Sequence, residues 1–183
     1  MERNSILEQN QVMETKRLLL RKITMEDAVA VFAWTSQAET VRYDNCNQHQ
    51  SIDETQKLIA EEILPRNHNN WGIVEKHTGT LIGRATLFVD EKSKIAVLSW
   101  VLNKDYWGKG YAPEAAKRLV DLCFQELNVL GIQALHHPEN INSGRVMKKI
   151  GMKHTGKVLQ SFKEELLFFD YWCLTLEEWR KNG

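Results

Sequence analysis

The stretch that decides the fold is Trp107-Gly108-Lys109-Gly110-Tyr111-Ala112, which joins an apolar run ending at Leu102 to an amphipathic helix that begins near Pro113. Two glycines in a loop that opens a helix let several backbone N–H groups point toward one place, where the helix dipole adds partial positive charge. The stretch therefore predicts a seat for a phosphate group. An ordinary tight turn is the alternative, because short glycine motifs are common.

Two familiar nucleotide motifs are absent from this loop. A Walker loop requires a lysine followed by Ser or Thr, but Lys109 is followed by Gly110. A dinucleotide fingerprint requires a further glycine where this chain has Pro113. The loop therefore predicts neither a P-loop nucleotide site nor a nicotinamide site.

Hydrophobic periodicity and capping signals give the elements around the loop. Four-residue capping boxes predict helices that begin at Thr24, at Ser51 and, near the end of the chain, at Thr175. Helices are also expected from Glu114 to just before Gly131 and over residues 143–150. Strands are expected at residues 17–23, 71–75, 81–89, 95–102, 132–135, 154–162 and 166–174.

This order places one strand–helix–strand crossover inside a mostly antiparallel arrangement, so the predicted fold is a mixed α/β sheet. If the strands at 95–102 and 132–135 are parallel neighbours, the glycine loop lies at the carboxyl end of the first. Open α/β sheets bind ligands at such ends.

Length and composition predict a single domain. The 183 residues with 43% hydrophobic content suffice for a core at residues 15–183, and the polar residues 1–14 are expected to form a flexible extension. Lysine and arginine number 24, as do aspartate and glutamate, so the chain lacks the basic excess typical of proteins that bind nucleic acid or anionic membranes.

The cysteines and the apolar runs indicate the compartment. Cys46, Cys123 and Cys173 are scattered, which predicts neither a disulfide framework nor a zinc site, and the histidines show no metal spacing. The longest apolar run, Ala28 to Trp34, is far short of the roughly 20 residues that cross a bilayer. We expect a soluble, unprocessed, cytoplasmic protein without a metal.

Four ordered motifs resemble the GNAT superfamily of acetyl-CoA-dependent N-acetyltransferases, and most closely its Rim-type branch, which acetylates the N-termini of ribosomal proteins. The resemblance runs from about Thr15 to Trp179. The motifs are Arg17-Leu18-Leu19-Leu20-Arg21, Trp107 to Ala115, Asn140 to Met152, and Asp170 to Trp179. It implies a mostly antiparallel sheet of about seven strands with one central crossover and helices on both faces.

The resemblance also implies how acetyl-CoA is held. Backbone N–H groups of Gly108, Lys109, Gly110, Tyr111 and Ala112 would bind the pyrophosphate, with a charge contact from Lys109 as an addition. The strand edge at Trp100, Val101 and Leu102 would pair with the pantetheine amides. Trp100 and Trp107 themselves are read as packing residues. Asn140 matches an asparagine that contacts the cofactor arm.

Acetyl transfer needs a donor for the oxyanion, a proton for the departing thiolate and a neutral amine. A backbone N–H at the Leu102 edge would serve the oxyanion. The tyrosine that protonates the sulfur in many relatives falls on Met147, which leaves Ser143 as the candidate acid. Ser143 is also a good N-cap, a role that is worth about 1 kcal/mol by itself.

The general base is open, because the acidic residue that Rim-type relatives carry falls on Val97. Glu164 and Glu165, on a hairpin turn that overhangs the acceptor site in the family, are the candidate bases, although a solvated turn is the alternative. Asp44, His49, His136 and His137 are further candidates. Asp170 is read as either structural or acceptor-facing.

The acceptor is predicted to be a primary amine, on a protein N-terminus or a small molecule, in a direct ternary complex. An α-amine with a pKa of about 8 is neutral in about a tenth of molecules at pH 7, so it needs the least from a base. The alternatives are a non-catalytic acyl-CoA-binding sensor or assembly domain and a nucleotide-binding protein. Relatives are commonly monomers or homodimers.

Overall fold

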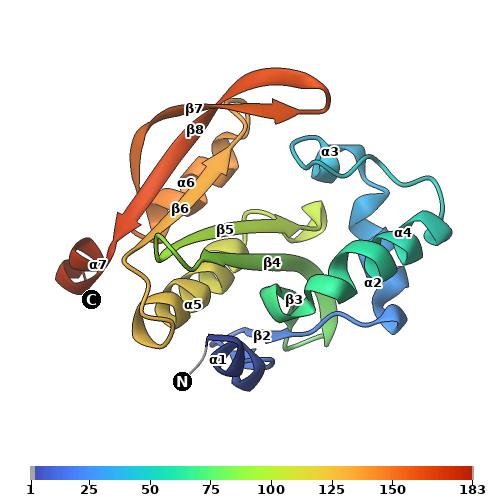
Figure 1. Ribbon diagram of the computed structural model, residues 1–183. Helices are drawn as coiled ribbons and strands as arrows, with labels where there is room; N and C mark the ends of the chain where they lie inside the picture. Colours follow the sequence, from blue (N-terminus) through green and yellow to red (C-terminus); the bar gives the residue numbers. More distant parts are fainter. Residues whose placement is uncertain (1–2, 183) are drawn as a thin grey trace.

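The computed structural model describes residues 3–182, which form one sheet of eight strands with helices on both of its faces (Figure 1). The strand order is β1-β2-β3-β4-β5-β6-β8-β7. The strands are β1 (Met13–Glu14), β2 (Leu18–Arg21), β3 (Asn70–Glu75), β4 (Thr80–Asp90), β5 (Ile95–Leu102), β6 (Gly131–His136), β7 (Lys153–Phe162) and β8 (Glu165–Thr175). Neighbouring strands are antiparallel except β5 and β6. The predicted mixed sheet with one central crossover is confirmed, with β1 as an additional strand.

Helices follow the predicted order. They are α1 (Arg3–Gln9), α2 (Ala28–Thr35), α3 (Ala38–Val41), α4 (Ile52–Leu58), α5 (Tyr111–Gln125), α6 (Ile141–Lys149) and α7 (Leu176–Asn182). Short turns of other helix types are η1 (Met25–Asp27), η2 (Ile59–Ile63), η3 (Leu64–Asn69) and η4 (Lys104–Tyr106). The capping boxes at Thr24 and Thr175 form as predicted, and the Ser51 side chain accepts the N–H of Glu54.

Two cores lie on opposite faces of the sheet. The larger one joins α5 to the sheet through residues such as Leu119, Leu122 and Leu98, all at most 2% exposed. The smaller one joins α2 and the α4–η2 segment to the other face through residues that include Val31 and Ile59. Because successive strand residues point to opposite faces, β2 and β3 contribute to both cores.

The N-terminal segment differs from the expected flexible extension. Residues 3–14 form α1 and β1, with Leu7 and Met13 each 3% exposed in the larger core. The Trp71 Nε1 group donates to the carbonyl of Asn10 at 2.8 Å. Leu7 and Met13 thus anchor this segment to the core, although its mostly polar composition did not indicate that it would pack there. Met1 and Glu2 lie outside the described residues.

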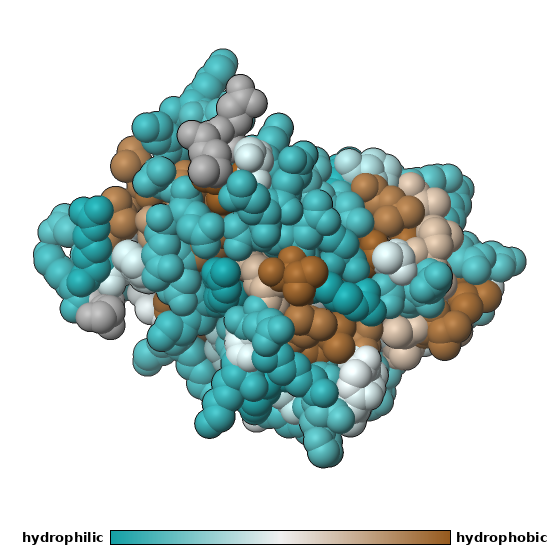
Figure 2. Space-filling view, turned by 90° about the horizontal axis from the view of Figure 1, so that it is seen from below, coloured by the Kyte–Doolittle hydropathy of each residue, from teal (hydrophilic) through white to brown (hydrophobic). Residues whose placement is uncertain are grey.

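Figure 2 shows a face that is largely hydrophilic and is interrupted by separate hydrophobic patches. Within the described residues, none of the helices combines the length and the apolar character needed to cross a membrane.

Candidate active site

A large cleft opens where β5 and β6 separate. Their parallel register covers only Ile95–Val97 with 131–133, so the rest of β5 has no partner on this side. A cleft of about 1020 Å³ occupies this place. Its walls come from β4, β5, the glycine loop, the start of α6, the β7–β8 hairpin and the segment that follows α3.

The glycine loop offers backbone donors at one end of the cleft. Gly108 and Gly110 have φ values of +77° and +80°, which glycine adopts without strain. Across residues 3–182, the N–H groups of the five residues from Gly108 to Ala112 have no acceptor in the protein. A Cβ added at Gly108 would meet nothing within 4 Å. Because α5 begins at Tyr111, its dipole adds positive potential, and the loop suits a diphosphate.

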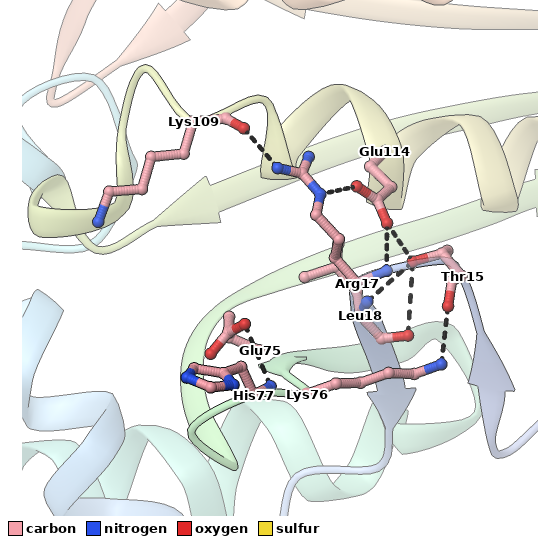
Figure 3. Close-up of polar contacts among 8 residues, drawn as sticks. All are labelled: Thr15, Arg17, Leu18, Glu75, Lys76, His77, Lys109 and Glu114. Atoms are coloured by element: carbon pink, nitrogen blue, oxygen red, sulfur yellow. Dashed lines mark hydrogen bonds and ion pairs between the residues drawn. The ribbon is translucent and has the colours of Figure 1, made fainter.

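Arg17 and Glu114 hold this loop from behind (Figure 3). The Glu114 carboxylate accepts the Thr15 hydroxyl at 2.6 Å, the Arg17 N–H at 2.8 Å and the Arg17 Nε group at 2.7 Å. The Arg17 Nη1 group donates to the Lys109 carbonyl at 2.9 Å. The guanidinium also lies 4.5 Å from the centre of the Tyr111 ring. The loop backbone is therefore fixed before any ligand binds.

Glu114 is charged in this arrangement. Burial raises the pKa of its carboxyl, but hydrogen bonds from Thr15 and Arg17 and the charge of Arg17 outweigh burial and hold the pKa below its ordinary value. Sequence reasoning placed Arg17 and Glu114 in motifs but missed their contact, since 97 residues separate them along the chain.

The side chains of the loop play different parts. Gly108, Gly110, Tyr111 and Ala112 line the cleft, whereas the Lys109 ammonium lies 4.9 Å from the Tyr106 ring centre and is not among the lining groups. Trp107 was expected to be a packing residue, but its side chain is 43% exposed and lines the cleft. Its Nε1 group donates to the Leu102 carbonyl at 2.6 Å, which ties the loop to the end of β5.

The β5 edge and the start of α6 form the two sides of the gap. Trp100, Val101 and Leu102 line the cleft on one side, and Asn140 and Ser143 line it on the other. The N-cap of α6 is Asn140, whose Oδ1 accepts the Ser143 N–H at 3.2 Å. The expectation that Ser143 caps the helix is therefore wrong, because the helix begins two residues earlier, at Ile141.

Two consecutive histidines line the cleft: His136 at the end of β6 and His137 directly after it. His136 is 8% exposed, and its Nδ1 donates to the His137 carbonyl at 2.8 Å. The His136 Nε2 packs against Gly144, where an added Cβ would lie 2.8 Å from it. The His137 Nδ1 accepts the Glu139 N–H at 3.2 Å, which leaves the proton of neutral His137 on Nε2.

The other candidate residues divide into two groups. Asp44 lines the cleft, as do Val97, which is 40% exposed, and Met147, which is otherwise buried in the larger core. Glu164 and Glu165 lie at the tip of the β7–β8 hairpin, where Lys163 and Glu164 have positive φ values, and neither glutamate lines the cleft.

His49 and Asp170 also lie away from the cleft. His49 is buried, with its Nδ1 at 2.7 Å from the Thr55 hydroxyl and its Nε2 at 3.3 Å from the Cys46 thiol. Asp170 lies 2.8 Å from His154 Nε2. Both have local partners that account for their positions.

An aromatic wall, formed by Tyr43, Phe162 and Phe169, lines part of the cleft, and no sequence motif signalled it. The Tyr43 ring stacks on His137 with centroids 5.0 Å apart, and Phe162 and Phe169 pack edge-on against each other at 5.7 Å. Tyr43 comes from the segment after α3 and the phenylalanines from the hairpin, so tertiary structure alone brings them together. Within the described residues no group of three potential metal ligands is found.

Comparisons with known proteins agree with this geometry. Residues 17–153 match the model of the acetyltransferase (GNAT) domain. The chain is 32% identical to the uncharacterized N-acetyltransferase YnaD of Bacillus subtilis, over 90% of this chain and 97% of that protein. It superposes on a GNAT-family acetyltransferase from Bacillus anthracis with a TM-score of 0.82 and 27% identity, covering 91% of this chain and 99% of the other.

A further structure shares the fold at 18% identity and a TM-score of 0.74, covering 91% of this chain and 99% of the other; it is a spermidine N-acetyltransferase from Vibrio cholerae in complex with CoA and spermine. The family model spans most of the chain, and the free loop amides and the separated strands lie inside the matched region. This chain belongs to the GNAT family of N-acetyltransferases.

Proposed function

We propose that the protein transfers an acetyl group from acetyl-CoA directly to a primary amine. The observation that carries this proposal is the row of unpaired N–H groups from Gly108 to Ala112 beside the unpaired end of β5. Amine acceptors are also supported by a relative, the spermidine N(1)-acetyltransferase of Escherichia coli, which is 24% identical over 78% of this chain and 76% of that protein.

The residues present fit acetyl-CoA. The loop N–H groups bind its diphosphate, and the β5 edge at Trp100–Leu102 pairs with its amides in the manner of an added strand. The amide of Asn140 contacts the same arm. When bound, acetyl-CoA supplies an acetyl group activated as a thioester.

Groups of the protein then stabilise the developing negative charge and transfer protons. A backbone N–H at the end of β5 donates to the oxygen on which negative charge develops. The Ser143 hydroxyl, free of the capping role, donates to the departing sulfur, since Met147 offers no proton. Of the candidate bases, Asp44, His136 and His137 line the cleft and are the groups that accept the amine proton in this proposal.

Calorimetry with acetyl-CoA, followed by thiol release across a panel of amines, tests the proposal. We expect binding and turnover with at least one amine. Gly108→Ala should weaken binding by about 10- to 100-fold, the cost of losing one or two hydrogen bonds to a charged group. Gly79→Ala is the matched control, because Gly79 also has a positive φ of +70° and open surroundings but lies in the β3–β4 turn.

The outcomes separate the competing functions. Absence of acetyl-CoA binding by the wild-type protein overturns the proposal. Binding without thiol release on any amine favours an acyl-CoA sensor instead. Adenine nucleotides that displace CoA completely would favour the nucleotide-binding alternative.

A further inference from the structure

The face of the sheet that meets the acceptor half of the cleft carries an arginine in its middle. Arg84 on β4 pairs across the sheet with Val101 on β5, and its neighbour Thr86 pairs with Ser99. All four residues line the cleft, and the Thr86 and Ser99 hydroxyls are hydrogen-bonded to each other at 2.5 Å. The residue between them, Ala85, points to the buried core. Arg84 is thus fixed on the open face by strand alternation.

Two acidic side chains that line the cleft are already paired with cations. Glu39 binds the Lys104 ammonium at 3.0 Å, and Glu139 binds the Arg42 guanidinium at 2.9 Å. Arg84 is half-buried, yet among residues 3–182 no carboxylate lies within 4.0 Å of it and it makes no side-chain hydrogen bond. Its guanidinium is therefore free to pair with an anionic group of a ligand.

Asp44 lies close to this arginine without contacting it. Both residues line the cleft, and both also line a small cavity beneath it with Cys46. The Asp44 Oδ1 accepts the Cys46 N–H at 3.2 Å, which fixes the carboxylate. The acceptor half therefore has a carboxylate and an unpaired guanidinium among its lining groups, and a molecule with an amine and an anionic group complements both.

We propose that the acceptor amine also carries an anionic oxygen group, a carboxylate or a phosphate, and that Arg84 binds this group. The inference rests on the proposed acetyl transfer and names its substrate class. The planar guanidinium donates two parallel hydrogen bonds to either anion, a geometry that lysine cannot reproduce. The adjoining aromatic wall of Tyr43, Phe162 and Phe169 suits an apolar body on the same molecule.

The same charges argue against a polyamine. A polyamine needs several unpaired carboxylates, whereas two of the cleft carboxylates here already bind cationic side chains. Placing a second ammonium group beside Arg84 would also bring like charges together in a partly desolvated cleft.

Matched acceptors that differ only in the anionic group test the inference. Phenylalanine is compared with phenethylamine, and O-phosphoethanolamine with ethanolamine, at equal concentrations of neutral amine; spermidine is the polyamine arm. We expect kcat/KM to favour the anionic member of one pair by at least about tenfold, and the preferred pair identifies carboxylate or phosphate. Arg84→Gln should abolish this preference, and Arg84→Lys should restore only part of it.

Controls separate recognition from other roles. Arg180→Gln makes the same charge change on α7, far from the cleft, and should leave the preference intact. Acetyl-CoA affinity and the unfolding temperature of Arg84→Gln should match the wild type. A preference of the wild type for the neutral amines or for spermidine overturns the inference. An equal loss of kcat/KM in Arg84→Gln on both members of a pair also overturns it, because Arg84 would then act in the transfer step. Absence of turnover with every amine overturns the proposed function itself.

Discussion

At the scale of single residues, Glu114 organises the phosphate loop through an arginine. Its carboxylate accepts three hydrogen bonds from Thr15 and Arg17, and Arg17 in turn holds the Lys109 carbonyl. Because the Lys109 carbonyl is held by Arg17, the N–H of Gly110 in the same trans peptide points away from Arg17. Preorganisation of this kind lowers the entropy lost on binding.

Arg17→Gln should loosen the loop and raise the Kd for acetyl-CoA by about tenfold, since the donors no longer share one fixed geometry. Titration calorimetry measures this change. Lys76→Gln is the control, because Lys76 binds Thr15 and Glu14 in the same cluster but does not touch the loop (Figure 3). Unchanged affinity in Arg17→Gln would show that the loop keeps its shape unaided.

Acid should destabilise the fold partly through Glu114. Its folded pKa lies below the value of about 4.3 in an unfolded chain, so its contribution is present above that pKa and is lost as pH falls toward the folded pKa. We expect the free energy of unfolding to fall between about pH 5 and pH 3, and to fall less steeply in Glu114→Gln. Urea titrations at fixed pH measure both slopes. Identical slopes would contradict this role for Glu114.

Variants of Ser143 and Asn140 should distinguish a catalytic role from a helix-capping role. Ser143→Ala removes a hydroxyl that does not cap α6, so we expect kcat to fall by at least about tenfold, the lower range for loss of a general acid, while stability stays within about 0.5 kcal/mol. Asn140→Ala removes the cap and should cost about 1 kcal/mol. Kinetics with thermal unfolding test the pair. If both changes lowered stability equally, Ser143 would have a structural role and not a catalytic one.

At this scale, the sequence predicted those site residues that belong to local motifs. The glycines of the loop, Asn140 and Ser143 all line the cleft, because short spacing along the chain fixes their places. Arg84 and Tyr43 could not be found, since their significance comes from strands and segments that meet only after folding.

At the scale of elements, the N-terminal segment shows the limit of composition as a guide. Residues 1–14 read as polar, but α1 needs only Leu7 to reach the core, and β1 needs only Met13. By contrast, the capping boxes at Thr24 and Thr175 predicted their helix starts well, because their signal is contained in four residues.

Leu7→Ala should therefore lower the free energy of unfolding by about 2–5 kcal/mol, the range for truncating a buried leucine. Val12→Ala, a change at a side chain that is 60% exposed, should have an effect within about 0.5 kcal/mol. Urea denaturation measures both variants. A negligible effect of Leu7→Ala would mean that the segment is docked without contributing to stability.

At the scale of the whole molecule, the sheet consists of two parts joined by a short seam. The parallel pairing of β5 with β6 spans three residue pairs, and α5 connects the parts through the larger core. The crossover was predictable from the order of elements, whereas a free strand edge at Trp100–Leu102 was expected only from the family resemblance, because nothing in either strand's composition signals the separation beyond Val97.

Acetyl-CoA should join the two parts. Hydrogen exchange at Trp100–Leu102 and at the loop N–H groups of Gly108–Ala112 should slow when it binds, while β3 is unaffected. At 100 times the Kd, the free energy of unfolding should rise by about 2.7 kcal/mol. Hydrogen-exchange mass spectrometry and thermal shift measure these changes. Protection confined to the loop would show that the β5 edge takes no part.

The gap between β5 and β6 has a consequence for inhibitor design. Main-chain edges recognise any extended amide backbone without regard to its side chains. A pantetheine mimic would therefore enter many enzymes of this architecture alike, whereas a compound selective for this enzyme must reach past the gap to the neighbourhood of Arg84.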